Sequence, residues 1–289
     1  MLKDLFKSFR LKQWVKNGFL FAGLIFDGQL FIWDSFAITA IGFAIFNFIT
    51  SGVYLINDVF DIAIDRQHPQ KKYRPIASGR IAVQHAILVA IFLLVISLIA
   101  AYLLSPIFFI LCAIYLVSNL LYSKWLKHVP ILDVMVIALG FVLRVAAGLT
   151  LISVKRFSPW LFVVTTLLAL YLGFGKRRAE IILFAENIKS GRSVLDGYTL
   201  PFLDQLITIV SSATIVAYSL YTFSALSNPG GYSMMLTIPF VMYGIFRYLY
   251  LVQVKQSGGA PEEILFQDIP LQITVILYAV CVFVLFYLI

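Results

Sequence analysis

Long apolar stretches, separated by short polar segments, dominate the chain. Several of them approach or exceed the roughly 20 residues that an α-helix needs to cross a bilayer. The predicted spans cover residues 18–31, 35–56, 81–104, 107–122, 131–152, 159–175, 206–226, 234–254 and 272–289. Asp27-Gly28 interrupts the first span, and Pro106 marks the turn between the third and the fourth. The pattern predicts an all-α, polytopic membrane protein with nine transmembrane helices.

The composition agrees with this class. Hydrophobic residues make up 61% of the chain and charged residues 12%, against about 25% charged in soluble proteins. The mean hydropathy is +0.95. Cys112 and Cys281 both lie in apolar stretches, where packed free thiols are expected rather than a disulfide. We expect a single integral membrane domain over residues 1–289.

The N-terminal segment, residues 1–17, is basic and is expected to form an amphipathic helix at the membrane interface with Trp14 as an anchor. It leads into more charge rather than into a small-residue cleavage site, so no cleaved signal peptide is expected. If the N-terminus is cytoplasmic, all lysines and arginines lie on cytoplasmic segments except Arg144, Lys155, Arg156 and Arg247. This asymmetry follows the positive-inside rule. It predicts an inner (cytoplasmic) membrane protein whose N-terminus and active site face the cytoplasm.

A polar stretch directly after the second span carries the most informative chemistry. Asp58, Asp61 and Asp65 lie at i, i+3 and i+7, on one stripe of a helix, and Asn57 joins them. Carboxylates held this close repel one another unless a cation lies between them, and oxygen ligands of this kind suit Mg²⁺. We therefore predict Asp58, Asp61 and Asp65 as magnesium ligands, with Asn57 as a neutral catalytic partner. The alternative is a solvated helix end at the membrane surface, but carboxylates in or beside a membrane favour function.

Basic and polar residues gather in the segments that would share the cytoplasmic side, chiefly in the loops 57–80 and 175–204. Candidate substrate-binding residues are Lys16, Asn17, Lys72, Arg74, Tyr122, Lys124, Lys127, Arg144, Lys176, Arg177, Arg178 and Glu180. Carboxylates in one loop and cations in the others predict a divided site for metal, diphosphate and further phosphates. The alternative for each basic cluster is a topology signal or a lipid headgroup contact. Arg144 falls within a span, so it should face the bundle interior and have a partner there.

The net charge of +8 is explained by membrane orientation and anionic ligands, and we expect no nucleic acid as a partner. Membrane lipids are expected partners by composition.

The acidic stretch also resembles a known motif. The run Asn57-Asp58-x-x-Asp61-x-x-x-Asp65, followed by Lys72-x-Arg74-Pro75-Ile76-x-Ser78-Gly79, resembles the first signature of the UbiA superfamily of intramembrane prenyltransferases. The resemblance covers essentially the whole chain. It implies nine transmembrane helices and Mg²⁺ bound to aspartate-rich motifs that hold a diphosphate.

Shorter features resemble one branch of that family, the decaprenyl-phosphate phosphoribosyltransferases. They are Arg10-Leu11-Lys12-Gln13-Trp14-Val15-Lys16-Asn17, Asp133 with Phe141-Val142-Leu143-Arg144-x-Ala146-x-Gly148, and Gly175-Lys176-Arg177-Arg178-Ala179-Glu180. The resemblance implies transfer of 5-phosphoribose from phosphoribosyl diphosphate to a polyprenyl phosphate.

The second loop departs from the common family pattern. It offers Glu180, Asp196 and Asp204 but no Asp-x-x-x-Asp pair, and it is rich in lysine and arginine. Such a loop suits ligands with more phosphate than an allylic diphosphate and an uncharged acceptor bring. We expect Lys176, Arg177 and Arg178 to meet the 5-phosphate of the donor. Two other functions stay open, namely a prenyltransferase that joins an allylic diphosphate to an aromatic or other small acceptor, and an ion-coupled transporter.

Overall fold

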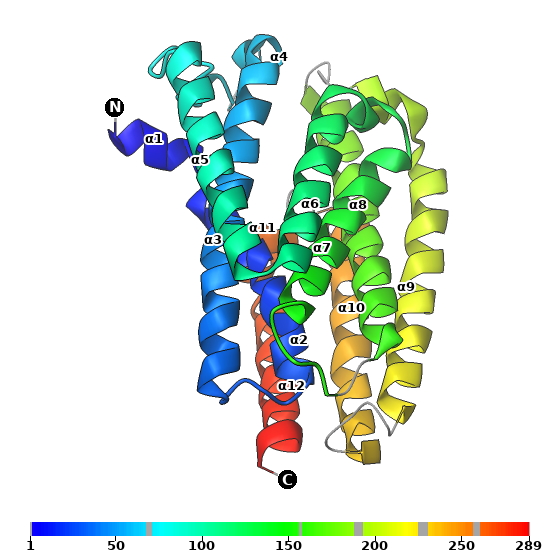
Figure 1. Cartoon of the computed structure of the whole chain (residues 1–289). Helices are drawn as coiled ribbons and strands as arrows, with labels where there is room; N and C mark the ends of the chain where they lie inside the picture. Colours follow the sequence, from blue (N-terminus) through cyan, green and yellow to red (C-terminus); the bar gives the residue numbers. More distant parts are fainter. Residues whose placement is uncertain are drawn as a thin grey trace. The chain divides into compact units, whose positions relative to one another are not determined.

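The computed structural model describes residues 2–67, 71–155, 158–187, 193–224, 231–256 and 261–288, and every regular element in these ranges is a helix (Figure 1). The all-α prediction is confirmed. The α-helices are α1 (Leu2–Ser8), α2 (Phe21–Phe26), α3 (Trp33–Phe60), α4 (Ile62–Gln67), α5 (Val83–Leu104), α6 (Pro106–Lys124), α7 (Leu132–Leu149), α8 (Pro159–Asn187), α9 (Leu200–Phe223), α10 (Ile238–Gln253), α11 (Pro261–Gln267) and α12 (Ile269–Tyr287). The 3-10 helices are η1 (Leu11–Leu20), η2 (Lys71–Tyr73), η3 (Leu126–His128), η4 (Ser193–Gly197) and η6 (Gly231–Thr237).

Eight helical segments of the described chain are long and apolar enough to cross a membrane. They are Trp33–Phe60, Val83–Leu104, Pro106–Lys124, Leu132–Leu149, Pro159–Ile182, Leu200–Phe223, Tyr232–Gln253 and Ile269–Tyr287. These segments match the second to the ninth predicted spans, and the chain is a multi-pass integral membrane protein.

The structure differs from the prediction at the first span, residues 18–31. This stretch is divided between the end of η1, the short helix α2 and a turn at Asp27-Gly28, where Gly28 has a φ of 72°. The carboxylate of Asp27 accepts the backbone N–H of Lys155 at 3.0 and 3.2 Å, which holds this turn. A buried carboxylate and a left-handed glycine end the helix well before it reaches membrane-spanning length.

Three of the long helices begin with the same combination of cap and proline. Ser105, Thr199 and Asp268 each accept a hydrogen bond from a backbone N–H in the first turn of α6, α9 and α12, respectively. A proline at the first or second helical position follows each cap. Capping side chains satisfy backbone donors that water cannot reach near a membrane, and proline at this position removes one such donor.

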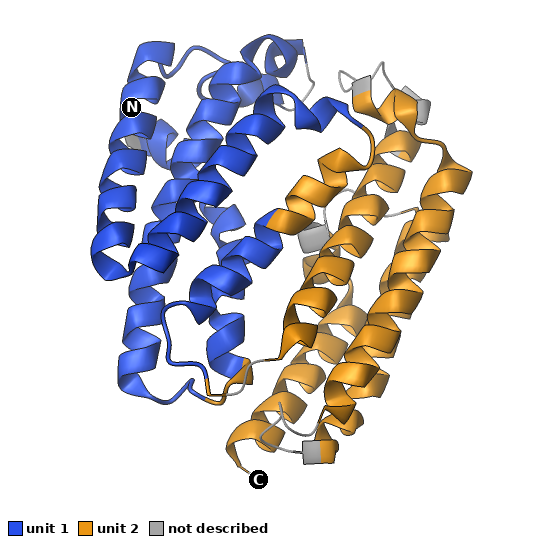
Figure 2. Ribbon diagram, turned by 45° about the vertical axis from the view of Figure 1, so that its right-hand side comes forward, with its two compact units in different colours: residues 1–25, 29–129, 140–154 blue, residues 26–28, 130–139, 155–289 orange. Residues whose placement is uncertain are grey.

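The described chain forms two compact units, each with its own core (Figure 2). Unit 1 comprises residues 1–25, 29–129 and 140–154, and unit 2 comprises residues 26–28, 130–139 and 155–289. In unit 1, α3 packs mainly against α5 and α6 around Phe46, Ile49 and Phe108. In unit 2, α8 packs against α9, with Tyr171 and Leu203 in the core. One domain over residues 1–289 stays a prediction.

In unit 1, a polar stripe along α3 positions η1. Trp14 Nε1 donates to Ser51 Oγ at 3.1 Å, and Asn17 Nδ2 donates to Asn47 Oδ1 at 2.6 Å and to Thr50 Oγ1 at 3.1 Å. Thr50 and Ser51 lie three and four positions after Asn47, so all three side chains are on one face of α3. Because buried amides and hydroxyls need hydrogen-bond partners, this stripe fixes how η1 lies along α3.

The close approach of α7 to η1 generates a testable prediction. A Cβ at Gly148 would lie 2.7 Å from the carbonyl carbon of Leu20 and still closer to its oxygen. Gly148→Ala should therefore force the two segments apart and lower the free energy of unfolding by about 1–3 kcal/mol. Thermal denaturation of the purified protein measures the loss. The matched control is Gly244→Ala in α10, where the nearest atom lies 4.0 Å away and no loss is expected.

Candidate active site

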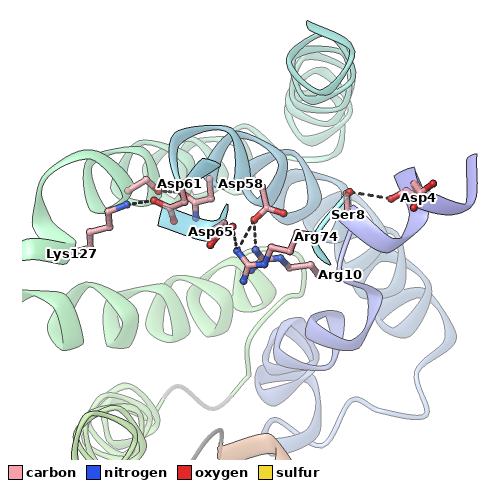
Figure 3. A network of polar contacts seen from close by, with 10 residues as sticks. Asp4, Ser8, Arg10, Asp58, Asp61, Asp65, Arg74 and Lys127 are labelled. Carbon is pink, nitrogen blue, oxygen red and sulfur yellow. Dashed lines mark hydrogen bonds and ion pairs between the residues drawn. The ribbon is translucent and has the colours of Figure 1, made fainter. Parts of the chain in front are cut away.

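The sequence predicted that the acidic motif lies on one continuous helix. In the structure the motif is divided between two helices. Helix α3 ends at Phe60, Asp61 forms the junction with φ −93° and ψ 6°, and α4 begins at Ile62. The backbone N–H of Asp61 still bonds to Asn57, and that of Asp65 bonds to Asp61. The break turns the Asp61 side chain toward a different partner from those of Asp58 and Asp65 (Figure 3).

Asp58 and Asp65 converge on one cationic atom. Nη1 of Arg74 lies 3.1 Å from Asp58 Oδ1 and 2.7 Å from Asp65 Oδ2. Both carboxylates are buried, and Arg74 lies just after η2 in the predicted basic segment. The geometry shows that two carboxylate oxygens can share one positive charge at this point, which is the environment that a hard divalent cation requires.

Two further cations complete the neutralisation of the motif. Arg10 Nη2 donates to Asp58 Oδ1, and its guanidinium lies 4.8 Å from the centre of the Tyr54 ring. Lys127 Nζ lies 2.5 Å from Asp61 Oδ1 and approaches from the opposite side to the arginines (Figure 3). Three carboxylates therefore meet three basic side chains, so the local net charge is zero.

Arg10 is not among the site residues predicted from the sequence, although it is one of the cytoplasmic charges and the first residue of the motif Arg10–Asn17. Its backbone adopts a left-handed conformation, with φ 53° and ψ 53°, at the start of η1. Residues other than glycine rarely adopt this conformation, and such strain is concentrated at functional sites. The motif Arg10–Asn17 marks this segment in the sequence, but it does not reveal the contact with Asp58, which lies 48 residues away.

The remaining predicted residues of this region are spread around the motif. Asn57 Oδ1 accepts a hydrogen bond from the buried Ser123 of α6, a residue that the sequence did not indicate. Tyr122 is half-buried at the end of α6. Lys72 and Lys124 are exposed and lie over the rings of Tyr73 and Trp125. Lys16 is half-buried in η1.

Arg144 is buried in α7, as expected for a charge within a span. Its Nε donates to Asn17 Oδ1 at 2.7 Å, and its Nη2 donates to Tyr115 OH at 2.9 Å. The guanidinium also lies 5.0–5.8 Å from the ring centres of Tyr115, Phe141 and Phe46. The sequence anticipated a partner for Arg144, and the hydrogen-bond partners in the structure are neutral.

Unit 2 contains a second charged cluster, centred on Asp133 and Arg177. Arg177 Nε lies 2.6 Å from Asp133 Oδ2, and its Nη1 lies 2.5 Å from Glu180 Oε2. The relative exposure is 2% for the Arg177 side chain and 0% for that of Asp133. The pair therefore joins α7 to α8 through a buried ion pair.

Tyr198 extends this cluster. Its hydroxyl donates to Asp133 Oδ1 at 2.6 Å and accepts the backbone N–H of Ile131 at 2.5 Å. Burial, together with the bond to Asp133, raises the pKa of Tyr198 well above its usual value, so the hydroxyl keeps its proton for this bond. Ile131 has a φ of 71°, which is unfavourable for a β-branched residue, and the hydrogen bond from Ile131 to Tyr198 helps to hold it.

The second arginine of this predicted phosphate-binding cluster is engaged in the same way. Arg178 Nε lies 2.6 Å from Asp204 Oδ1, and Arg178 Nη1 donates to the carbonyl of Val252 at 2.9 Å. Arg177 and Arg178 thus both have carboxylate partners, and Lys176 is half-buried beside them. Residues 188–192 of the predicted loop 175–204, with Lys189 and Arg192, lie outside the described residues, as do residues 68–70 of the loop 57–80.

Among the described residues, no three His, Cys, Asp or Glu side chains are arranged as a ready-made metal site. The donor set nevertheless fits a divalent cation, because Asp58 and Asp65 already converge on one positively charged atom. Asp58 and Asp65 are the residues that would hold such an ion.

The eight apolar helices of the described chain and the buried, paired carboxylates at the end of a span define a polytopic membrane protein with a charged site in unit 1. The model of the UbiA prenyltransferase family matches residues 18–267. The chain belongs to this family and is a transferase. The transporter alternative is therefore set aside.

The chain is also similar in sequence to individual named proteins. The chain is 32% identical to the decaprenyl-phosphate phosphoribosyltransferase of Corynebacterium glutamicum, over 98% of this chain and 86% of that protein. It is also 32% identical to the enzyme of that name from Mycobacterium tuberculosis, over 92% of this chain and 89% of that protein.

Solved structures show the same fold. A UbiA homologue from Archaeoglobus fulgidus bound to DMAPP and Mg²⁺ aligns with a TM-score of 0.73 at 18% identity, over 99% of this chain and 100% of that chain. The predicted UbiA-type fold is thereby confirmed.

The buried Asp133–Arg177 pair generates a second prediction. Asp133→Asn leaves the Arg177 charge with one carboxylate fewer, and breaking a buried pair costs about 3–5 kcal/mol. We expect a large fall in the midpoint of thermal denaturation. The control is Asp4→Asn, which breaks the exposed 3.4 Å pair with Arg80 and should cost less than about 1 kcal/mol. Equal losses in the two variants would contradict the structural role of Asp133.

Proposed function

We propose that the protein transfers 5-phosphoribose from phosphoribosyl diphosphate to a polyprenyl phosphate of the decaprenyl type and releases diphosphate, with Mg²⁺ as cofactor. Family membership and the named relatives support the reaction class. The observation that carries the proposal is the convergence of Asp58 and Asp65 on a single cationic atom, 3.1 and 2.7 Å from their oxygens.

Asp58, Asp61 and Asp65 would hold Mg²⁺, with Asn57 at the edge of the site. When bound, the metal would neutralise the diphosphate and so improve it as a leaving group. Arg10, Arg74 and Lys127, which contact these carboxylates, would supply positive charge to the phosphate oxygens of the substrates.

The proposed chemical step needs no side-chain nucleophile. An oxygen of the polyprenyl phosphate forms a bond to C1 of the ribose, and the bond from C1 to the diphosphate oxygen breaks with its electron pair. The acceptor is already an anion near neutral pH, so no base is required. The residues of the chain therefore act by positioning the two anions and compensating their charge.

The basic residues have different tasks in this proposal. Lys72 and Lys124 are exposed enough to reach a phosphate, and Lys16, Tyr122 and Lys176 are half-buried. We assign Arg177, Arg178 and Glu180 a supporting task, because their charges are paired within unit 2. We place the protein in the inner membrane with its N-terminus and active site facing the cytoplasm, and the distribution of basic residues supports this orientation.

The metal assignment gives a third prediction. The Asp61 side chain is 31% exposed and carries the ion pair to Lys127, so Asp61→Asn should leave the fold intact. It should abolish Mg²⁺-dependent turnover, because a metal ligand is lost. Turnover against Mg²⁺ concentration measures the effect, and Asp34→Asn, exposed at the other end of α3, is the control. Wild-type activity of Asp61→Asn in Mg²⁺ would show that Asp61 is not a ligand.

The choice of substrates is tested directly. The purified protein is offered phosphoribosyl diphosphate with a polyprenyl phosphate and, separately, an allylic diphosphate with an aromatic acid. Mass spectrometry of the lipid products should detect the phosphoribosylated lipid from the first mixture. Product from the second mixture alone would instead establish a prenyltransferase that joins an allylic diphosphate to an aromatic acceptor.

A further inference from the structure

Arg144 differs from the buried arginines Arg177 and Arg178 in the groups that compensate its charge. It is 6% exposed, and it donates hydrogen bonds to an amide oxygen and to a hydroxyl. Within the described part of the chain it forms no ion pair with a carboxylate, whereas Arg177 and Arg178 each do. A buried charge without a counter-ion is strongly unfavourable, and aromatic rings compensate it only in part.

One edge of the guanidinium is left open to a ligand. Nε and Nη2 are engaged with Asn17 and Tyr115, and among the described residues Nη1 has no hydrogen-bond acceptor. Nη1 lies beside Gly140, one helical turn earlier in α7. A Cβ at Gly140 would come within 3.3 Å of Nη1 and 3.6 Å of the Tyr115 ring. Because residue 140 is glycine, no Cβ covers Nη1 from this side.

Arg144 is connected through Asn17 to α3, the helix that carries Asp58 of the acidic motif. Asn17 joins Arg144 to Asn47 and Thr50 on the polar stripe of α3, and Asp58 lies further along the same helix. At about 1.5 Å per residue, Thr50 and Asp58 are roughly 12 Å apart along α3. Both sites belong to unit 1. An anion at Arg144 would thus lie on the same polar face as a diphosphate at Asp58 and Asp65, but at a different depth.

We propose that Arg144 and the space beside Gly140 form a binding subsite for a phosphate monoester, with Asn17 and Tyr115 orienting the guanidinium. The proposal rests on the proposed function for its ligand, since both substrates of that reaction carry such a group. They are the 5-phosphate of the donor and the phosphate of the lipid acceptor. Arginine suits this group because its planar fork can pair two donors with two phosphate oxygens.

The test measures binding to the full-length protein in detergent, without metal, by isothermal titration calorimetry. Ribose 5-phosphate and farnesyl phosphate are the two probes, and ribose and farnesol are their phosphate-free controls. Arg144→Gln should weaken the binding of one phosphate probe at least tenfold, as expected for a lost charge-assisted bond, and leave its phosphate-free control unchanged. Loss with ribose 5-phosphate assigns the subsite to the donor, and loss with farnesyl phosphate assigns it to the lipid.

A control variant checks that the effect is specific to Arg144, and a second variant tests the subsite without removing the arginine. Arg247→Gln removes another arginine within a span, but one already paired with Asp268 at 2.8 Å, and should leave both affinities unchanged. Gly140→Ala keeps Arg144 and its bonds but narrows the space at Nη1, and should weaken the same probe several-fold. If Arg144→Gln does not fold, Gly140→Ala decides the question. Its unchanged affinity would overturn the proposal.

The inference and the proposed function fail in different ways. If the wild type binds neither phosphate probe, or if Arg144→Gln binds both as the wild type does, the subsite is refuted, whatever the transfer assay shows. If the wild type makes no phosphoribosylated lipid but its phosphate binding depends on Arg144, the proposed function is wrong and the subsite stands.

Discussion

Compensation of buried charge is the constraint on which both units of this protein depend. An apolar membrane surrounding makes an isolated carboxylate or guanidinium very costly, so each needs an opposite charge or a full set of hydrogen bonds. In unit 1, Arg10, Arg74 and Lys127 neutralise the three aspartates of the motif. In unit 2, Asp133 and Asp204 neutralise two arginines of α8. These pairs join segments far apart in the sequence, so charge compensation also holds the helices in register.

The neutral acidic motif has a consequence for catalysis. Three aspartates without counter-charges would repel one another, and their cluster would destabilise the folded protein. Internal cations remove this repulsion, so the site can exist before any ligand arrives. In the proposed function, Asp58, Asp61 and Asp65 would hold Mg²⁺, and the basic side chains beside them would offer charge to phosphate oxygens.

The periodic features of the sequence were predictable, and the pairings were not. Hydrophobic length predicted nine spans, eight of which match membrane-spanning helices of the described chain, and the spacing of Asp58, Asp61 and Asp65 marked the candidate site. The helix junction at Asp61 was not predicted, because the spacing of the aspartates along the sequence does not show where tertiary contacts end a helix. Lys127 lies 66 residues from Asp61, and Arg10 lies 48 residues from Asp58. Such partners depend on which helices approach one another. The prediction of a first span over residues 18–31 was wrong for a local reason, because Asp27 and Gly28 form a turn.

Arginines that look alike in the sequence differ in the groups that compensate their charge. Arg144 and Arg177 are both buried in long apolar helices, and both were candidates for phosphate binding. Arg177 has Asp133 and Glu180 within 2.6 Å, so an incoming anion would compete with two carboxylates already in place. Arg144 meets neutral hydrogen-bond acceptors and aromatic rings, so an incoming anion would supply the missing counter-charge. Of the two, only Arg144 gains electrostatically from phosphate without giving up an ion pair. The capacity of a buried arginine to bind substrate is therefore decided by what already neutralises it.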